Sequence, residues 1–426
     1  MSARDNQNGD LEPRPVRGRS AKQSRSELRK AAVTEGVISG LANPGVAGLT
    51  HRLVARRSGA SLAATTYYFA AKRDMIAEAS NTMLSGYLAD FARAAASVRG
   101  GGPDGFRGFV ARLTGNGMGR HRERTLAWCE LILDGARDED ARALVRTWFV
   151  QLEQVWGEIA RAYGVPDASA AARSGIDMTV GALFHGLALG LEPHEMAGAF
   201  GGDGTLSARL QRLAQQSATA DRGASVKGAR TRAQILEAAI ALLAERGAAG
   251  VTYRAVARRA GLSPAAAGYY FASSGALLSE AQRALFARSK ARYREVMLSA
   301  VPGLDLPGMA ELSGMIFQRE VLAHARMNLA TYAIWLQAAR NPGLWPMVQE
   351  ALGDLCRAWR RRLESLGAAA AGPEPLLVQY LFVGSLIRAL ASGASAENID
   401  AIRESLTADL GALAAGRHWA VEPATA

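Results

Sequence analysis

A repeat of roughly 200 residues constrains this chain more than any other feature. Shifted by 202 positions, residues 48–70 (GLTHRLVARRSGASLAATTYYFA) align without a gap on residues 250–272 (GVTYRAVARRAGLSPAAAGYYFA), and 15 of the 23 positions are identical. The similarity continues downstream at a shift of 203, where residues 130–137 align with residues 333–340. A whole unit is therefore duplicated, and the 426 residues are expected to hold two copies of one fold.

The composition favours helices in both copies. Hydrophobic residues make up 49% of the chain, Ala is abundant and Pro is sparse. Ala, Leu, Arg and Glu lose little free energy on entering a helix. No apolar run reaches 18 residues, and the N-terminus is polar and basic, so we expect neither a membrane-spanning helix nor a signal peptide. The expectation is an all-α protein of the cytoplasm.

Catalytic and metal chemistry is not indicated. The two cysteines, Cys129 and Cys356, stand far apart in the sequence, and the six histidines form no HExxH pattern, so we expect no metal site. The glycine-rich run at 115–120 lacks the Lys-Ser/Thr of a phosphate-binding loop and follows no predicted strand. We therefore expect neither an enzyme nor a cofactor.

The positive charge is concentrated in two segments. Of the net charge of +11, residues 1–74 carry +7 and residues 222–275 carry +6, so the remainder of the chain sums to −2. Two basic segments at equivalent places in two repeats predict two surfaces that bind a polyanion such as DNA. Two solvated helix faces are the alternative interpretation of the charge alone.

Local signals divide the start of each repeat into three helices. In the second copy, residues 230–247 have the apolar spacing of a helix, and Thr252 can cap a shorter helix after it. Gly261 suits a tight turn, and Ser263 can cap a third helix with Pro264 at its first position. Two short helices joined by a glycine-containing turn, after a longer supporting helix, are typical of a helix-turn-helix.

The first copy repeats this order with Thr50, Gly59 and Ser61. Both copies carry T-x-x-x-V-A-x-x-x-G-x-S followed by two aromatic residues and Phe, and this pattern resembles the TetR family of bacterial repressors. The resemblance is specific over residues 25–80 and 227–282, and only architectural beyond them. It implies that each copy has a three-helix DNA-binding head followed by a helical core for effector binding and dimerisation.

The resemblance also implies which residues contact DNA. Side chains on the second helix of the pair contact base edges, and flanking basic and aromatic side chains contact phosphates. The expected contacts in head one are Thr50, Arg52, Ser61, Leu62, Ala63, Ala64, Thr65, Thr66, Tyr67, Tyr68 and Lys72. Those in head two are Thr252, Arg254, Ser263, Pro264, Ala265, Ala266, Ala267, Gly268, Tyr269 and Tyr270. Ser274 replaces the basic residue of head one, which predicts weaker phosphate contact in head two.

The two cores are expected to form a pseudo-dimer within one chain. In relatives the last two core helices pair across a two-fold axis, and here both pairs belong to one chain, with further self-association left open. The expected division is a disordered basic arm at 1–24, head one at 25–80, core one at 81–200, a linker at 201–226, head two at 227–282, core two at 283–417 and a tail at 418–426.

A small apolar or aromatic effector is expected to bind in the cores. The candidate contacts are Trp128, Glu130, Trp148 and His185 in core one, and His324, Tyr332, Trp335 and Trp345 in core two. Aromatic residues at helical spacing, and a lone His in such a helix, more often belong to plain core packing, which is the alternative for each of them.

The sequence therefore predicts a sequence-specific DNA-binding regulator, and the resemblance favours a ligand-responsive repressor. Leu62, Thr65 and Thr66 of head one correspond to Pro264, Ala267 and Gly268 of head two, so the operator is expected to be asymmetric. The alternatives are a helical interaction scaffold, or a homodimer in which head two no longer binds DNA.

Overall fold

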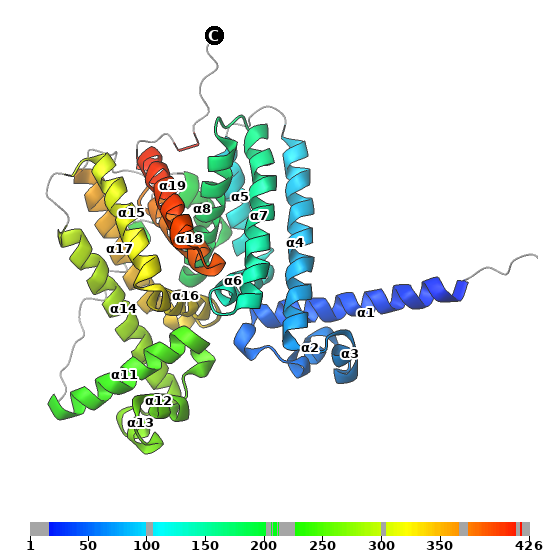
Figure 1. Ribbon diagram of the computed structural model, residues 1–426, viewed down its shortest axis with the longest axis horizontal. Helices are drawn as coiled ribbons and strands as arrows, with labels where there is room; N and C mark the ends of the chain where they lie inside the picture. Colours follow the sequence, from blue (N-terminus) through cyan, green and yellow to red (C-terminus); the bar gives the residue numbers. More distant parts are fainter. Residues whose placement is uncertain are drawn as a thin grey trace, which may run out of the picture.

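The computed structural model describes residues 17–98, 105–201, 226–299, 304–365 and 374–414, together with residues 206, 208–210, 212 and 418–419. Within these residues the secondary structure is helical, which confirms the all-α prediction. Figure 1 shows two small heads on the same side of a larger helical body, to which both repeats contribute.

Unit one contains a head of three helices and a core. The head comprises α1 (Arg17–Ala42), the 3-10 turn η1 (Val46–Gly48), α2 (His51–Ser58) and α3 (Leu62–Tyr68). The core comprises α4 (Lys72–Ser97), α5 (Gly105–Met118), α6 (Arg122–Gly135), α7 (Glu139–Ala162), α8 (Ala168–Leu189) and α9 (Pro193–Gly201).

Unit two repeats this order. Its head comprises α11 (Val226–Arg246), η2 (Ala248–Gly250), α12 (Tyr253–Ala260) and α13 (Pro264–Tyr270). Its core comprises α14 (Ser274–Ser299), α15 (Leu306–Leu322), α16 (Ala325–Arg340), η3 (Pro342–Leu344), α17 (Trp345–Ser365), α18 (Glu374–Ser392) and α19 (Ala396–Ala414).

Three of the expected segments, the arm, the linker and the tail, lie only partly within the described residues. Helix α1 begins at Arg17, so residues 17–24 of the expected arm are helical, while residues 1–16 lie outside the described residues. Most of the expected linker also lies outside them, as does the tail apart from His418 and Trp419. Trp419 packs edge-on against Phe106 of core one at 5.0 Å between ring centroids, so the end of unit two contacts unit one.

The capping residues expected in both heads form as the sequence predicts. The hydroxyl of Thr50 accepts from Leu53 N at 3.2 Å, and that of Ser61 accepts from Ala64 N at 3.1 Å. Thr252 and Ser263 cap α12 and α13 in the same way. Each turn contains a glycine with φ of 67°, a left-handed conformation that suits a residue without a Cβ.

Helices α8 and α18 cross at the centre of the molecule and make its most extensive interhelical contact among the described residues. Each contributes a glycine to the crossing, and the two glycines are equivalent in the repeat. A Cβ built on Gly181 would lie 1.8 Å from the carbonyl oxygen of Tyr380, and one built on Gly384 would lie 1.7 Å from that of Asp177. Asp177 and Tyr380 are themselves equivalent, so a pseudo-two-fold axis relates the two units at this crossing.

One segment, Pro375–Ser392 of α18, is long and apolar enough to cross a membrane by length and composition alone. Inside the molecule 94% of this segment is buried, as expected for the central helix of a packed core.

Candidate nucleic-acid interface and effector cavity

Helices α3 and α13 expose the same positions in the two heads. Tyr67 is 81% exposed and its equivalent Tyr269 is 83% exposed. Leu62, at the start of α3, is 47% exposed, and Thr66 and Gly268 also face solvent. Large apolar and aromatic side chains exposed at matching places in both repeats indicate a surface that another molecule covers.

The expectation that Thr65 and Ala267 contact DNA is wrong. Both side chains are fully buried, and the Thr65 hydroxyl donates to the carbonyl of Leu62 at 2.8 Å. The reason is helical periodicity, because each residue lies four positions before a buried phenylalanine and therefore shares its inward face. Their neighbours on the outer face are exposed: Ser61, Leu62, Ala63, Thr66 and Tyr67 in head one, and Ser263, Pro264, Ala265, Gly268 and Tyr269 in head two.

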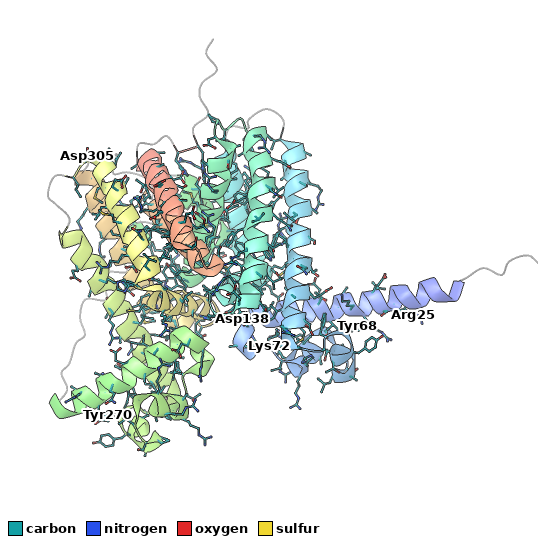
Figure 2. The ribbon with its side chains drawn as sticks, in the orientation of Figure 1. Arg25, Tyr68, Lys72, Asp138, Tyr270 and Asp305 are labelled. Carbon is teal, nitrogen blue, oxygen red and sulfur yellow. The ribbon has the colours of Figure 1, made fainter. Side chains whose placement is uncertain are left out.

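The remaining predicted contacts flank this outer face. Thr50 and Thr252 are exposed capping residues, and Ala64, Tyr68, Ala266 and Tyr270 are half-buried. The Tyr68 hydroxyl donates to the carbonyl of Ser26 at 3.2 Å, which fixes α3 against α1. Figure 2 places Tyr68 and Lys72 in head one and Tyr270 in head two, with Asp305 at the opposite end of the body.

Basic side chains at the heads divide into two groups. Arg52 and Arg254, in the first turns of α2 and α12, are exposed, and Lys72 is half-buried at the start of α4. Arg57 donates to the carbonyl of Asn43 at 3.3 Å, and Arg259 pairs with Glu245 at 2.7 Å, so these two arginines are held against their own heads. The first group is therefore the better placed to contact phosphate.

Core one contains a cavity among α4 to α8 that is partly open to solvent. Its walls are mainly aromatic and aliphatic: Tyr87, Phe91, Leu113, Gly117, His121, Thr125, Trp128, Trp148, Leu152, Trp156, Ile176, Thr179 and Leu183. The predicted effector contacts Trp128 and Trp148 are among these residues. Burial raises the pKa of Tyr87 to about 12, so this phenol stays neutral and can donate or accept a hydrogen bond.

Core two has a cavity at the equivalent place, with different walls. Ser313, Ile316, Leu355, Ala358, Trp359, Gln379, Phe382 and Val383 line it. Gln379 stands where core one has Ile176, and Phe382 stands where core one has Thr179. The two cavities therefore differ in shape and polarity.

The other predicted effector contacts lie outside both cavities. Tyr332 and Trp335 pack on Phe184 and His185 across the contact between the units, at ring-centroid distances of 6.1 and 4.7 Å. Trp345 donates through Nε1 to the carbonyl of Ala338. His324 lines neither cavity, and its Nε2 accepts a hydrogen bond from Arg319 Nε at 3.4 Å.

Glu130, also expected at the effector site, instead joins the two units. Its Oε1 accepts from Arg340 Nη1 at 2.6 Å, and its Oε2 accepts from Val46 N in head one at 3.4 Å. Arg340 also donates to the carbonyl of Ala42 at 2.7 Å. Core two is thereby connected to head one, and Ala333 replaces Glu130 in the second repeat.

A buried ion pair between the units was not foreseen from the sequence. Asp177 of α8 accepts from Arg388 Nε at 2.6 Å and Nη2 at 2.8 Å, and the hydroxyl of Ser385 donates to the same carboxylate at 2.8 Å. In the repeat, Asp177 aligns with Tyr380 and Arg388 aligns with His185. These two differences between the repeats, an acidic residue in one copy and a basic residue in the other, were the sequence signal that could have indicated the pair.

On the other side of the pseudo-two-fold axis, His185 and Tyr380 occupy the positions equivalent to Arg388 and Asp177. The His185 ring lies 5.0 Å from that of Tyr380, and its Nδ1 donates to the carbonyl of Gly181 at 2.7 Å. Complete burial lowers the pKa of His185 to about 4, so the ring is neutral at physiological pH.

Acidification should therefore destabilise the joint core through His185. Because the folded-state pKa is depressed, its contribution is present above the unfolded pKa of about 6.5 and is lost as the pH falls toward the folded value. We expect about 2 kcal/mol of stability to be lost between about pH 7 and pH 5 through this group. Denaturant unfolding of a His185→Gln variant measures it: the variant should show a correspondingly flatter pH dependence, and an identical slope would contradict the assignment.

Comparison with known proteins agrees with this architecture. The family model for the tetracyclin repressor-like C-terminal domain matches residues 101–216, from core one into the expected linker, and residues 305–412 in core two, and together these cover more than half of the chain. The N-terminal model for bacterial regulatory proteins of the tetR family matches residues 235–281, which include the helix-turn-helix of head two. No curated protein matches the chain. The chain belongs to the TetR family and is a DNA-binding transcriptional regulator.

Proposed function

We propose that this regulator is a ligand-responsive repressor of the cytoplasm whose single chain presents two unlike heads to one asymmetric operator. The observation that carries the proposal is the crossing of α8 and α18, which joins the two cores within one chain while both heads extend from the same side (Figure 1). Homodimeric repressors read palindromes because identical recognition helices are related by a two-fold axis. Here the axis relates two recognition helices whose side chains differ, so the two half-sites should differ as well.

The proposed division of labour follows the helix order. Residues 25–80 and 227–282 form the two heads, and residues 81–200 and 283–417 form the two cores. The exposed residues of α3 and α13 read base edges, with Leu62 and Thr66 in one half-site and Pro264 and Gly268 in the other.

Selection from random DNA should yield two half-sites of different stringency. Thr66 is exposed, and its hydroxyl, which donates to the carbonyls of Leu62 and Ala63, can still accept a hydrogen bond from a base edge. Gly268 offers no side chain, so head one should select the more stringent half-site. A Gly268→Thr variant should sharpen the second half-site, with roughly fivefold discrimination from one added hydrogen bond. A Cβ at Gly268 meets no atom within 4 Å, so the substitution should not disturb the head.

The matched variant Thr66→Gly should relax the first half-site by a similar factor. The stoichiometry of the minimal complex is measured alongside, and one chain per operator is the expected value. A perfect palindrome bound by two chains through head one alone would instead support the homodimer in which head two is idle.

Phosphate contacts should contribute equally to binding of all DNA sequences. Replacing Arg52 or Arg254 with Ala should weaken binding to specific and random DNA alike, and reduce the slope of log affinity against log salt by about one. The matched control is Arg93→Ala, an exposed arginine in the last turns of α4, in the core rather than in a head. Retention of DNA on a filter over a range of salt measures the slope; an unchanged slope in both head variants would remove these residues from the interface.

Effector binding would act by favouring the conformation in which the heads fit the operator less well. A coupling of 1–3 kcal/mol, typical of such linkage, corresponds to a change in operator affinity of about 5–150-fold. The bridge from Arg340 to Glu130 and head one supports such coupling, since it connects core two to head one directly. Compounds that raise the melting temperature should therefore alter operator affinity.

A further inference from the structure

The cavity of core one has a chemical character that limits its ligand. Its lining includes no Asp, Glu, Lys or Arg. Three buried polar atoms on lining residues have no hydrogen-bond partner among the described residues: Nε1 of Trp128, Nε1 of Trp156 and Oγ1 of Thr179. Two of these atoms can only donate. A buried donor without a partner carries a free-energy cost that an acceptor on a ligand would remove.

In core two the space beside Gln379 and Phe382 stays open, but the part that corresponds to Gly117 and Thr125 of core one is filled by protein side chains. Glu320 stands where core one has Gly117, and Asn328 stands where core one has Thr125. Both core-one residues line the cavity, and a Cβ built on Gly117 would lie 3.1 Å from Thr125 Oγ1 and 2.8 Å from a methyl carbon of Leu183. A longer side chain at this position therefore enters the space that core one leaves open.

In core two these residues form a buried polar cluster with Arg292 of α14. Glu320 is 1% exposed and accepts from Arg292 Nε at 2.9 Å and Nη2 at 2.8 Å. Asn328 Nδ2 donates to the Glu320 side chain at 3.0 Å and to its backbone carbonyl at 3.1 Å. Because these charges satisfy one another, a ligand entering here would have to break a buried ion pair, which is costly.

The aromatic side chains of the two cores also differ at equivalent positions. Trp128 and Trp148 of core one, which lie 5.9 Å apart between ring centroids, correspond to Thr331 and Ala351 in core two. Flat indole faces favour a flat aromatic ligand by stacking. Core two lacks both faces.

We infer that core one alone binds the effector, and that this effector is a flat, uncharged aromatic molecule bearing at least one hydrogen-bond acceptor, which Trp128 or Trp156 contacts. This inference rests on the proposed ligand-responsive function and specifies its site. An ionised carboxylate fits this cavity poorly, because no Lys or Arg lines it to pair with the charge and His121 is the one lining side chain that can become cationic, and burying an unpaired charge is strongly unfavourable.

Isothermal titration calorimetry on the full chain with three probes of one shape tests the ligand class. Fluorenone carries a carbonyl acceptor, fluorene lacks it, and fluorenone carboxylate adds a charge. We expect one fluorenone per chain, with about tenfold tighter binding than fluorene, because its carbonyl also satisfies a donor that is otherwise buried without a partner. The carboxylate should bind more weakly than either. Two fluorenones per chain, or tightest binding of the carboxylate, would overturn the inference.

Substitutions that remove a donor but keep an aromatic ring identify the site. Trp128→Phe and Trp156→Phe should each be compared with Trp359→Phe, the equivalent of Trp156 in core two. At least one core-one variant should lose the tenfold preference for fluorenone over fluorene while still binding fluorene. The core-two variant should keep it. If the preference survives in both core-one variants, or disappears in the core-two variant, the assignment is wrong.

DNA binding is measured separately on the same samples, so that a failure of the ligand-responsive function can be told from a failure of the inferred ligand class. Binding of fluorenone at one site per chain without any change in operator affinity would refute ligand responsiveness to this class but leave the assigned site intact. Normal operator binding with no affinity for any of the three probes would refute the inferred ligand class.

Discussion

Replacing Gly384 with Ala should lower the free energy of unfolding by at least about 3 kcal/mol, because the new Cβ would lie 1.7 Å from the carbonyl oxygen of Asp177. The obstacle is backbone rather than the end of a flexible side chain, so α8 and α18 must move apart. Separation also weakens the contacts of the buried residues on both helices, which adds to the cost of overpacking. Gly181→Ala should behave similarly, since its Cβ would lie 1.8 Å from the carbonyl oxygen of Tyr380.

Thermal and denaturant unfolding measure this effect, and Gly86→Ala in α4 is the matched control. Gly86 lies within a helix and has no atom within 4 Å of a built Cβ. The control should raise stability by roughly 0.5–1 kcal/mol, the usual gain for Gly→Ala inside a helix. Combining Gly181→Ala with Gly384→Ala should cost less than the sum of the two, since one separation relieves both clashes. If Gly384→Ala unfolds like the unchanged chain, the crossing is not as close as described.

Removing one partner of the ion pair between Asp177 and Arg388 should cost about 3–5 kcal/mol. Arg388→Met would leave the buried carboxylate of Asp177 with the Ser385 hydroxyl as its remaining side-chain donor among the described residues. Asp177→Leu would leave a buried guanidinium whose other carboxylate partner is Glu153, at 3.0 Å. Either single change leaves a charge without its bidentate partner in a nearly water-free contact.

The double variant Asp177→Leu with Arg388→Met should recover most of this loss. Replacing both partners of a buried pair with apolar residues is often neutral or stabilising, because neither buried charge then remains to be desolvated. Glu153, the other partner of Arg388, keeps its charge but is 34% exposed and can be hydrated. Urea unfolding of the four forms gives the coupling energy directly. A double variant no more stable than the weaker single variant would show that the pair stabilises the contact by packing rather than by charge.

The heads could be predicted closely because local signals specify them. The capping hydroxyls of Thr50 and Ser263 and the turn glycines act within a few residues of their own position. The orientation of Thr65 was also available locally, because it lies one helical turn before the buried Phe69, yet its hydroxyl suggested a base contact.

The core contacts could not be predicted in the same way. Glu130 pairs with a residue 210 positions away, and Asp177 pairs with one 211 positions away, so neither contact is visible in local periodicity. Trp335 and His185 have the spacing of cavity residues but lie at the contact between the units, which only the relative placement of the cores determines.

The crossing of α8 and α18 also bears on how this regulator responds to its own abundance. A repressor that must first associate from separate subunits occupies its operator, at low concentration, in proportion to the square of the subunit concentration. When both halves of the binding surface are covalently joined, that first association is intramolecular and independent of concentration. If one chain binds one operator, as proposed, operator occupancy should rise with the first power of the number of chains per cell, and a small or fluctuating supply of the protein should give a proportionate rather than a steep transcriptional response.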